Sequence, residues 1–190
     1  MPITLFETVL PNPTELLAEI MRCDFGPSSH TRVDAGGNRT LVEDVGPHYA
    51  TIALGGTNPA FRPVRTANQR IITAIVERLF GPSVRLVDWM VRRNLPGSFL
   101  PIHADNSIPH RDPATGGTVW VRTQPYTVTS VLWLGEWQGG EIEFPQHALT
   151  LKPKPNTLAV FPADEHHLHR VHPVREGCRI AWVGRYLVET

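Results

Sequence analysis

Two short segments that lie far apart in the sequence carry side chains able to bind a metal ion. His103 and Asp105 are two residues apart, so on a β-strand both side chains point to the same face. A third ligand from a distant strand would complete a set of two histidines and one carboxylate, which holds Fe(II) and leaves coordination positions open. The sequence contains a second copy of the motif, His110 and Asp112. That copy is flanked by prolines, where a strand cannot continue, so we expect the metal at the first copy.

Four histidines near the end of the chain are candidates for the third ligand: His166, His167, His169 and His172. On a regular strand His167 and His169 share one face, while His166 and His172 share the other. Histidines are also common at surfaces or as hydrogen-bonded core residues. Strand alternation therefore divides the four candidates between two faces, but it does not identify the ligand.

Arg179 lies at the start of an apolar stretch that is typical of a core strand, after a turn predicted at Glu176 and Gly177. A buried guanidinium is costly unless it is paired with an anion. An arginine in such a strand, close to a metal-binding histidine, therefore indicates a metal enzyme with an acidic co-substrate.

Composition sets limits on the class of protein. The chain has 190 residues and a formal net charge of zero, so bulk electrostatics does not support a nucleic acid or an anionic membrane as partner. The two cysteines do not form a zinc or disulfide pattern. The N-terminus does not resemble a signal peptide, and we see no apolar run long enough to span a membrane. We therefore expect a cytoplasmic protein, while the oligomeric state stays open.

The first part of the chain predicts two helices and few strands. After a short strand over residues 3–6, Asn12 and Pro13 are typical of a helix start. We interpret residues 28–47 as a mobile loop and residues 49–54 as a strand. A capping box from Thr66 to Gln69 predicts the start of the second helix, which Gly81 ends.

After Pro82 the sequence is dominated by short β-rich segments separated by proline and glycine. We predict strands over residues 85–92, 98–103, 126–134, 141–144, 148–151, 157–161, 168–172 and 179–188. This pattern favours a sandwich or barrel that is mainly β, with helices packed outside it. Residues 1–190 are expected to form one domain, with 1–82 as helical support and N-terminal strands and 83–190 as the barrel core. Residues 106–124 are the one long irregular segment inside this β-rich region, and we predict that they form a lid.

From residue 97 to residue 186 the chain resembles the 2-oxoglutarate- and Fe(II)-dependent dioxygenases of the prolyl-4-hydroxylase type. The resemblance is carried by the order and spacing of several short pieces. These are Pro96 and Gly97 ahead of His103, Asp105 and Asn106, then residues 129–134, 139–144, 151–155, 158–162 and 169–174, and finally Gly177 to Arg179.

The resemblance implies a fold, a ligand set and a reaction. The fold would be a double-stranded β-helix, also called a jelly roll, with the metal in its mouth. His103, Asp105 and His169 would bind Fe(II), and Arg179 would bind the distal carboxylate of 2-oxoglutarate. The reaction would consume O2, release succinate and CO2, and hydroxylate a substrate C–H bond. Ascorbate would be an additional cofactor.

Some residues near the predicted site depart from the family pattern, and others allow two interpretations of their role. Family members often carry a tyrosine just before the Pro-Gly pair and another near residue 133, where this chain has Leu95 and Trp133. The indole N–H of Trp133 can replace one hydroxyl donor. Thr129 is either a donor to a co-substrate carboxylate or a good strand former. Arg185 would share a strand face with Arg179, and we expect it at a solvated strand end.

The substrate is the least constrained part of the prediction. We expect a small molecule, such as an amino acid or a natural-product intermediate, rather than a protein. The alternatives are a hydroxylase of prolyl or other side chains in proteins and a nucleobase demethylase, which the zero net charge disfavours. A non-catalytic barrel that binds a metal or another ligand is the competing class.

Overall fold

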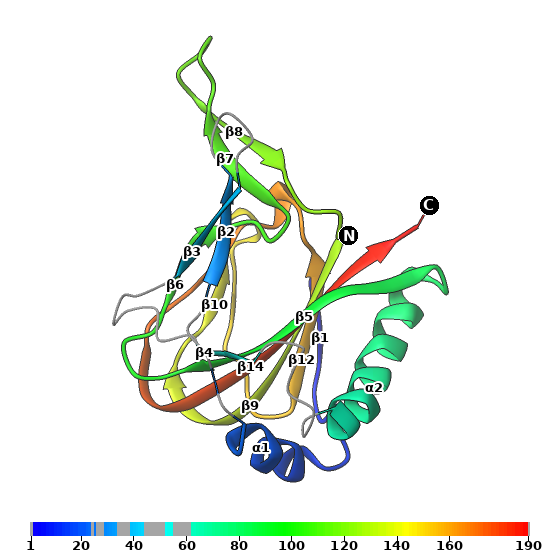
Figure 1. Cartoon of the computed structure of the whole chain (residues 1–190). Helices are drawn as coiled ribbons and strands as arrows, with labels where there is room; N and C mark the ends of the chain where they lie inside the picture. Colours follow the sequence, from blue (N-terminus) through cyan, green and yellow to red (C-terminus); the bar gives the residue numbers. More distant parts are fainter. Residues whose placement is uncertain are drawn as a thin grey trace.

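Two antiparallel β-sheets face each other and form a double-stranded β-helix, which confirms the predicted fold (Figure 1). The computed structural model describes residues 2–23, 25, 29–33, 39–43, 52–54 and 62–189. The larger sheet contains, in spatial order, β1 (Thr4–Phe6), β12 (Thr157–Pro162), β9 (Val128–Gly139), β14 (Val174–Val188), β5 (Val84–Asn94) and β4 (Ile52–Leu54). The smaller sheet contains β11 (Leu149–Leu151), β10 (Ile142–Phe144), β13 (His169–Val171) and β6 (Leu100–His103). Two short 3-10 helices lie between strands: η3 (Pro145–His147) connects β10 and β11 of the smaller sheet, and η4 (Glu165–His167) connects β12 of the larger sheet to β13 of the smaller one.

Two helices, α1 (Pro13–Met21) and α2 (Arg62–Phe80), cover the outer face of the larger sheet (Figure 1). Ile20 of α1 and Val76 of α2 are fully buried against that face. The predicted start of α1 at Pro13 is confirmed. The chain contains no helix, within the described residues, that is both long and apolar enough to cross a membrane.

The predicted start of α2 is wrong. The helix begins at Arg62, so Thr66 lies inside it and does not cap it. The side chain of Gln69 instead donates a hydrogen bond to the Tyr186 hydroxyl at 2.9 Å, which ties the helix to β14. The predicted end is confirmed, because Gly81 has a φ of +92°, a conformation that glycine adopts without steric cost.

Strands β9 and β14 pair along almost their whole length and separate two apolar clusters. Leu132 and Trp182 belong to the cluster beneath the helices. Their neighbours Val131 and Val183 belong to the cluster inside the barrel. This alternation follows from the two-residue period of a strand. Residues that face the interior of the barrel therefore alternate with residues that anchor the helices.

Two segments that were interpreted as loops form β-hairpins, so both interpretations are wrong for those residues. Strands β2 (Ser29–Val33) and β3 (Arg39–Glu43) lie in the first segment, whose remaining residues are outside the described part of the chain. Strands β7 (Ser107–Arg111) and β8 (Thr118–Arg122) form the second hairpin, which extends away from the barrel (Figure 1). Pro109 is accommodated there because a two-stranded ribbon leaves edge positions where no N–H is needed.

The predicted turn at Glu176 and Gly177 is also wrong, because β14 runs without interruption from Val174 to Val188. The chain bends at this point instead: the pairing register with β9 shifts between Val174 and Glu176, and Gly177 has a φ of +77°. A Cβ at Gly177 would collide with the carbonyl oxygen of Glu136. The glycine therefore allows β9 and β14 to approach closely while β14 continues toward the site.

Candidate metal and co-substrate site

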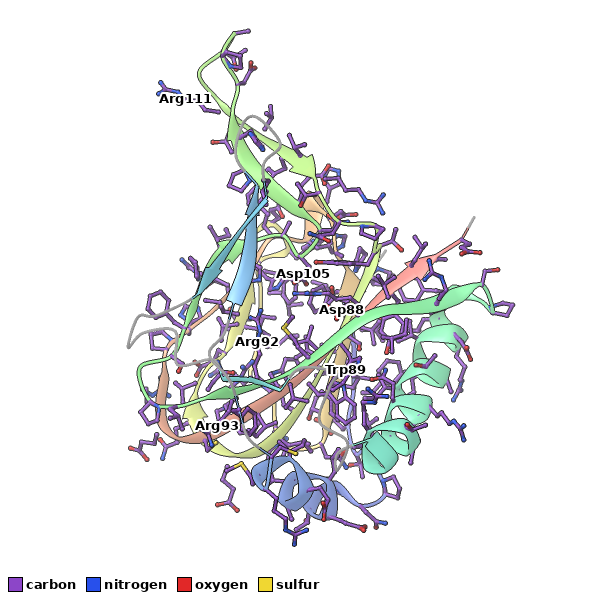
Figure 2. All side chains as sticks on the ribbon, in the orientation of Figure 1. Asp88, Trp89, Arg92, Arg93, Asp105 and Arg111 are labelled. Carbon is purple, nitrogen blue, oxygen red and sulfur yellow. The ribbon has the colours of Figure 1, made fainter. Side chains whose placement is uncertain are left out.

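Three side chains that could bind a metal meet at the mouth of the barrel. His103 ends β6, Asp105 follows two residues later, and His169 begins β13. One ligand atom from each lies within 4.8 Å of the others. The imidazole Nε2 of His169 is 3.8 Å from the Asp105 carboxylate. Asp105 lies in the interior between the two sheets (Figure 2). The structure thus brings together the three residues that the sequence predicted as ligands.

Backbone carbonyls fix the orientation of both imidazoles. The Nδ1 atom of His103 lies 2.8 Å from the Pro101 carbonyl oxygen, and that of His169 lies 3.0 Å from the His167 carbonyl oxygen. With Nδ1 donating to a carbonyl, the lone pair is on Nε2, the arrangement common for metal-binding histidines. Tyr126 donates its hydroxyl to the Asp105 carbonyl oxygen at 2.6 Å and so holds the third ligand in place.

The surroundings of His103 and Asp105 favour the protonation states that metal binding requires of these two residues. Burial, followed by the neighbouring His169, lowers the pKa of His103 from 6.5 to about 4. Burial alone would raise the pKa of Asp105, but His169, His103 and Arg185 together hold it below its ordinary value. The Oδ2 atom of Asp105 is buried and has no hydrogen-bond partner among the described residues. A neutral imidazole, a carboxylate and a buried unsatisfied oxygen fit a divalent cation.

Aromatic rings form the wall behind His169. The ring centroids of Phe144 and Phe161 lie 5.3 Å and 5.0 Å from that of His169. Both phenylalanines are fully buried. This apolar wall keeps water away from one side of the candidate metal position and strengthens electrostatic interactions there.

Arg179 lies deeper in the same cavity, on β14. Its side chain is almost fully buried, and its Nη1 donates to the Asn94 Oδ1 at 3.0 Å. Burial, with the charge of Arg92 adding to it, lowers the pKa of Arg179 to about 9. Its Nε has no partner within the part of the chain that the structure describes. An anion bound in the cavity would therefore relieve an electrostatic cost that the protein carries without it.

The other predicted site residues differ in how they face the cavity. Thr129 lines it, and its hydroxyl helps to lower the pKa of Asp105, so it lies on the metal side. Trp133 is fully buried beneath the Arg179 guanidinium, 5.7 Å from ring centroid to Cζ. Arg185 does not lie at a solvated strand end: it lines the cavity and forms an ion pair with Asp88 at 3.1 Å.

The histidines that were the other candidates for metal binding do not line the cavity. His172 contacts the Glu143 carboxylate at 2.7 Å, and His167 contacts Asp164 at 2.7 Å. His110 lies on β7 of the protruding hairpin. None of these residues belongs to the group that could hold a metal, as far as the described residues show.

Two residues of the cavity were missed in the sequence, Arg92 and Asn94. Both lie on β5, two residues apart, and therefore on the same face. Figure 2 shows Arg92 on the interior side of β5 and Trp89 on the side of α2. Leu95, which was compared with a tyrosine of the family, is instead 37% exposed. The predicted strand over residues 85–92 was too short: extended to Asn94, strand alternation would have placed Asn94 on the same face as Arg92.

Comparisons with known proteins agree with this geometry. The family model described as "2OG-Fe(II) oxygenase superfamily" matches residues 89–186. No curated protein sequence matches the chain.

Three solved structures are similar in fold, each at low sequence identity. A prolyl hydroxylase from Trichoplax adhaerens, in complex with a hypoxia inducible factor peptide fragment, has a TM-score of 0.67 at 17% identity, covering 98% of this chain and 83% of that one. A prolyl-4-hydroxylase from Pseudomonas putida has a TM-score of 0.57 at 18% identity, with 99% and 93% covered. The viral collagen prolyl hydroxylase from Paramecium Bursaria Chlorella virus-1, in its 2OG complex, has a TM-score of 0.57 at 15% identity, with 99% and 96% covered.

These neighbours correct one expectation from the sequence. All three are named as prolyl hydroxylases, and one was solved with a peptide fragment of a protein. The preference for a small molecule over a protein as substrate is therefore contradicted.

Proposed function

The chain belongs to the 2OG-Fe(II) oxygenase superfamily, and from that premise we propose that it hydroxylates a prolyl side chain in a peptide or protein. As a member of the superfamily it is a 2-oxoglutarate-dependent dioxygenase that uses Fe(II), 2-oxoglutarate and O2. The prolyl substrate is suggested by the neighbours in fold, which are named as prolyl hydroxylases.

The observation that carries the proposal is the cluster of His103, Asp105 and His169. These residues would hold Fe(II) through two imidazole Nε2 atoms and one carboxylate oxygen. Bound there, Fe(II) supplies the redox chemistry by which O2 oxidises 2-oxoglutarate to succinate and CO2 and one oxygen atom enters a substrate C–H bond. The set leaves coordination positions open for the keto acid and O2.

Arg179 would bind the distal carboxylate of 2-oxoglutarate. Its planar guanidinium matches a carboxylate in a bidentate geometry, and burial makes the charge-assisted bond strong. Trp133 would add its indole N–H, whose Nε1 has no acceptor in the described segments of the chain. Thr129, beside Asp105, would donate a hydrogen bond to the carboxylate of 2-oxoglutarate that lies near the metal.

Exposed apolar side chains on the hairpin that follows Asp105 support a peptide-sized substrate. Val119 and Val121 of β8 are 45% and 44% exposed. Large exposed apolar residues that gather beside a site commonly mark a surface for another chain. The hairpin of β7 and β8 follows Asp105 directly, so a bound peptide would contact it while its prolyl ring enters the cavity.

A peptide-library experiment tests the proposal. The protein is incubated with Fe(II), 2-oxoglutarate and a library of proline-containing peptides, and products are read by mass spectrometry as the gain of one oxygen atom on proline. The matched control replaces that proline by alanine in each active peptide, and His169→Ala provides the inactive enzyme. If no peptide gains oxygen while succinate formation stays at its substrate-free rate, the prolyl substrate is wrong.

A further inference from the structure

Asn94 and Arg179 lie directly opposite each other on the paired strands β5 and β14. Both side chains are 3% exposed, and both line the cavity that holds the metal-binding cluster. The Nη1 of Arg179 donates to the Oδ1 of Asn94 at 3.0 Å. This cross-strand pair holds the guanidinium by a neutral acceptor, whereas a buried arginine is more often paired with a carboxylate.

We propose that Asn94 positions Arg179 and is itself a second donor to the distal carboxylate of the keto-acid co-substrate. The inference rests on the proposed role of Arg179 in binding that carboxylate. It identifies Asn94 as the residue that completes the carboxylate site. The resemblance to the family had drawn attention to the neighbouring Leu95, which is exposed.

The orientation of the Asn94 amide follows from donor and acceptor chemistry. A guanidinium has five N–H donors and no acceptor, so only the amide oxygen of Asn94 can face it. The Nδ2 group, with two N–H donors, is therefore turned away from Arg179. Because Asn94 lines the cavity next to Arg179, these donors are available to an acceptor that Arg179 also binds.

Gly140 fixes the place of the Arg179 side chain from the other direction. A Cβ at Gly140 would lie 2.9 Å from the Cδ of Arg179 and 3.3 Å from its Nε. The φ of Gly140 is +65°, which a glycine adopts without strain. The absence of a side chain at Gly140 thus leaves the space that the Arg179 side chain occupies. Asn94 binds the guanidinium at the far end of that side chain.

The surroundings of the Arg179 guanidinium are rich in donors. The Nε of Arg179 is buried and has no acceptor among the residues described, and the same holds for Nε1 of Trp133, whose ring lies under the guanidinium. The Asn94 amide adds further donors, and a carboxylate offers two oxygens with about four lone-pair sites. A neutral residue at position 94 keeps the positive charge of Arg179 for the ligand, whereas an aspartate would neutralise it.

The test compares two keto acids that differ at the distal end alone. 2-Oxoglutarate carries the distal carboxylate, and 2-oxobutanoate keeps the metal-chelating end without it. Binding of each to the metal-loaded protein is measured by calorimetry without O2, so no turnover and no protein substrate are needed. For Asn94→Ala we expect the affinity for 2-oxoglutarate to fall about tenfold, the loss typical of a hydrogen bond to a charged group, with 2-oxobutanoate unchanged. For Asn94→Asp we expect a larger loss for 2-oxoglutarate alone.

Asn156→Ala is the matched control for loss of a buried asparagine. Asn156 is 8% exposed, its side chain makes two hydrogen bonds to the backbone of Leu10, and it does not line the cavity. This variant should lower the melting temperature without changing the affinity for either keto acid. Asn94→Ser, which keeps a small polar group, replaces the alanine variant if that one does not fold.

Three outcomes would overturn the inference. The first is an unchanged 2-oxoglutarate affinity in the Asn94 variants, and the second is an equal loss for both keto acids. In the third, Asn94→Asp binds 2-oxoglutarate as well as the wild type does. Failure of the prolyl substrate would leave these binding results intact, whereas an unchanged affinity in Arg179→Met would refute the role of Arg179 itself.

Discussion

His103 and His169 are paired across the antiparallel strands β6 and β13, with their ring centroids 4.3 Å apart. The pairing of these two residues in the strand register therefore brings together two proposed ligands from distant parts of the chain. A slip of one residue in β13 would replace His169 by Leu168 or Arg170 on that face. The register shift that follows His169 in the same pairing ends the regular ladder immediately beyond the site.

Replacing any of the three proposed ligands should abolish iron-dependent turnover. We expect His103→Ala, Asp105→Ala and His169→Ala to lose Fe(II) affinity and all succinate formation, because all three residues are the proposed ligands of the ion. His110→Ala is the matched control, since His110 belongs to the second copy of the motif on the hairpin. Loss of iron binding in His110→Ala, with His103→Ala unaffected, would place the metal at the second copy.

Arg179→Met should raise the concentration of 2-oxoglutarate needed for half-maximal succinate formation at least tenfold. Loss of one partner of a buried charge pair costs on the order of 3–5 kcal/mol, and methionine fills similar space without the charge. Arg170→Met serves as control, because Arg170 is paired with Glu143 at 2.8 Å on the exposed side of the smaller sheet. Equal 2-oxoglutarate requirements in both variants would exclude Arg179 from the co-substrate site.

The hairpin of β7 and β8 should become protected when the substrate binds. Amide hydrogen exchange over residues 107–122 is expected to slow on addition of an active peptide to the iron- and 2-oxoglutarate-loaded protein. Trp120→Ala should reduce the yield of hydroxylated product per succinate, because Trp120 is the large aromatic side chain of β8, in the hairpin that follows Asp105.

Arg111→Ala provides the control for the hairpin, because Arg111 lies far out along it (Figure 2). This variant should keep the ratio of product to succinate. If exchange ignores the substrate and Trp120→Ala stays fully coupled, the hairpin does not cover the site.

The metal-free protein should become less stable as the pH falls from about 6.5 to about 4. In the unfolded chain His103 takes up a proton near its ordinary pKa of 6.5, whereas in the folded protein it does so only near about 4. Between these values the unfolded state binds more protons, so the free energy of unfolding decreases as the pH is lowered. Urea denaturation across this range measures the effect, and His103→Gln should show a flatter dependence. An equally steep dependence in that variant would assign the effect to other groups.

The sequence predicted the residues that strand alternation and motif spacing determine. The His-x-Asp spacing indicated His103 and Asp105, the family resemblance added His169, and the fold brings these three side chains together. Arg179 lies inside the barrel, as expected for a residue of a core strand. Asn94 was missed because the motif comparison drew attention to Leu95, one residue along the chain, and a strand turns adjacent residues to opposite faces.

The errors in the fold have physical causes as well. The hairpin of β7 and β8 protrudes from the barrel, so its strands lack the pattern of one buried and one polar face that identifies a strand in sequence. The start of α2 was placed at Thr66 because a capping box is a strong signal, although Pro63 is typical of the first turn of a helix. The bend at Gly177 resembles a turn in sequence because glycine marks both features.

The alternation along β9 and β14 makes two properties of the protein separately adjustable. Leu132 and Trp182 belong to the helix-side cluster, and their neighbours Val131 and Val183 line the catalytic cavity. Mutational libraries restricted to the first set and to the helices should yield thermostable variants with unaltered kinetics. Libraries restricted to the second set should alter substrate scope with smaller changes in melting temperature. Laboratory evolution can therefore search the two sets one after the other, because a single sheet keeps their side chains on opposite sides.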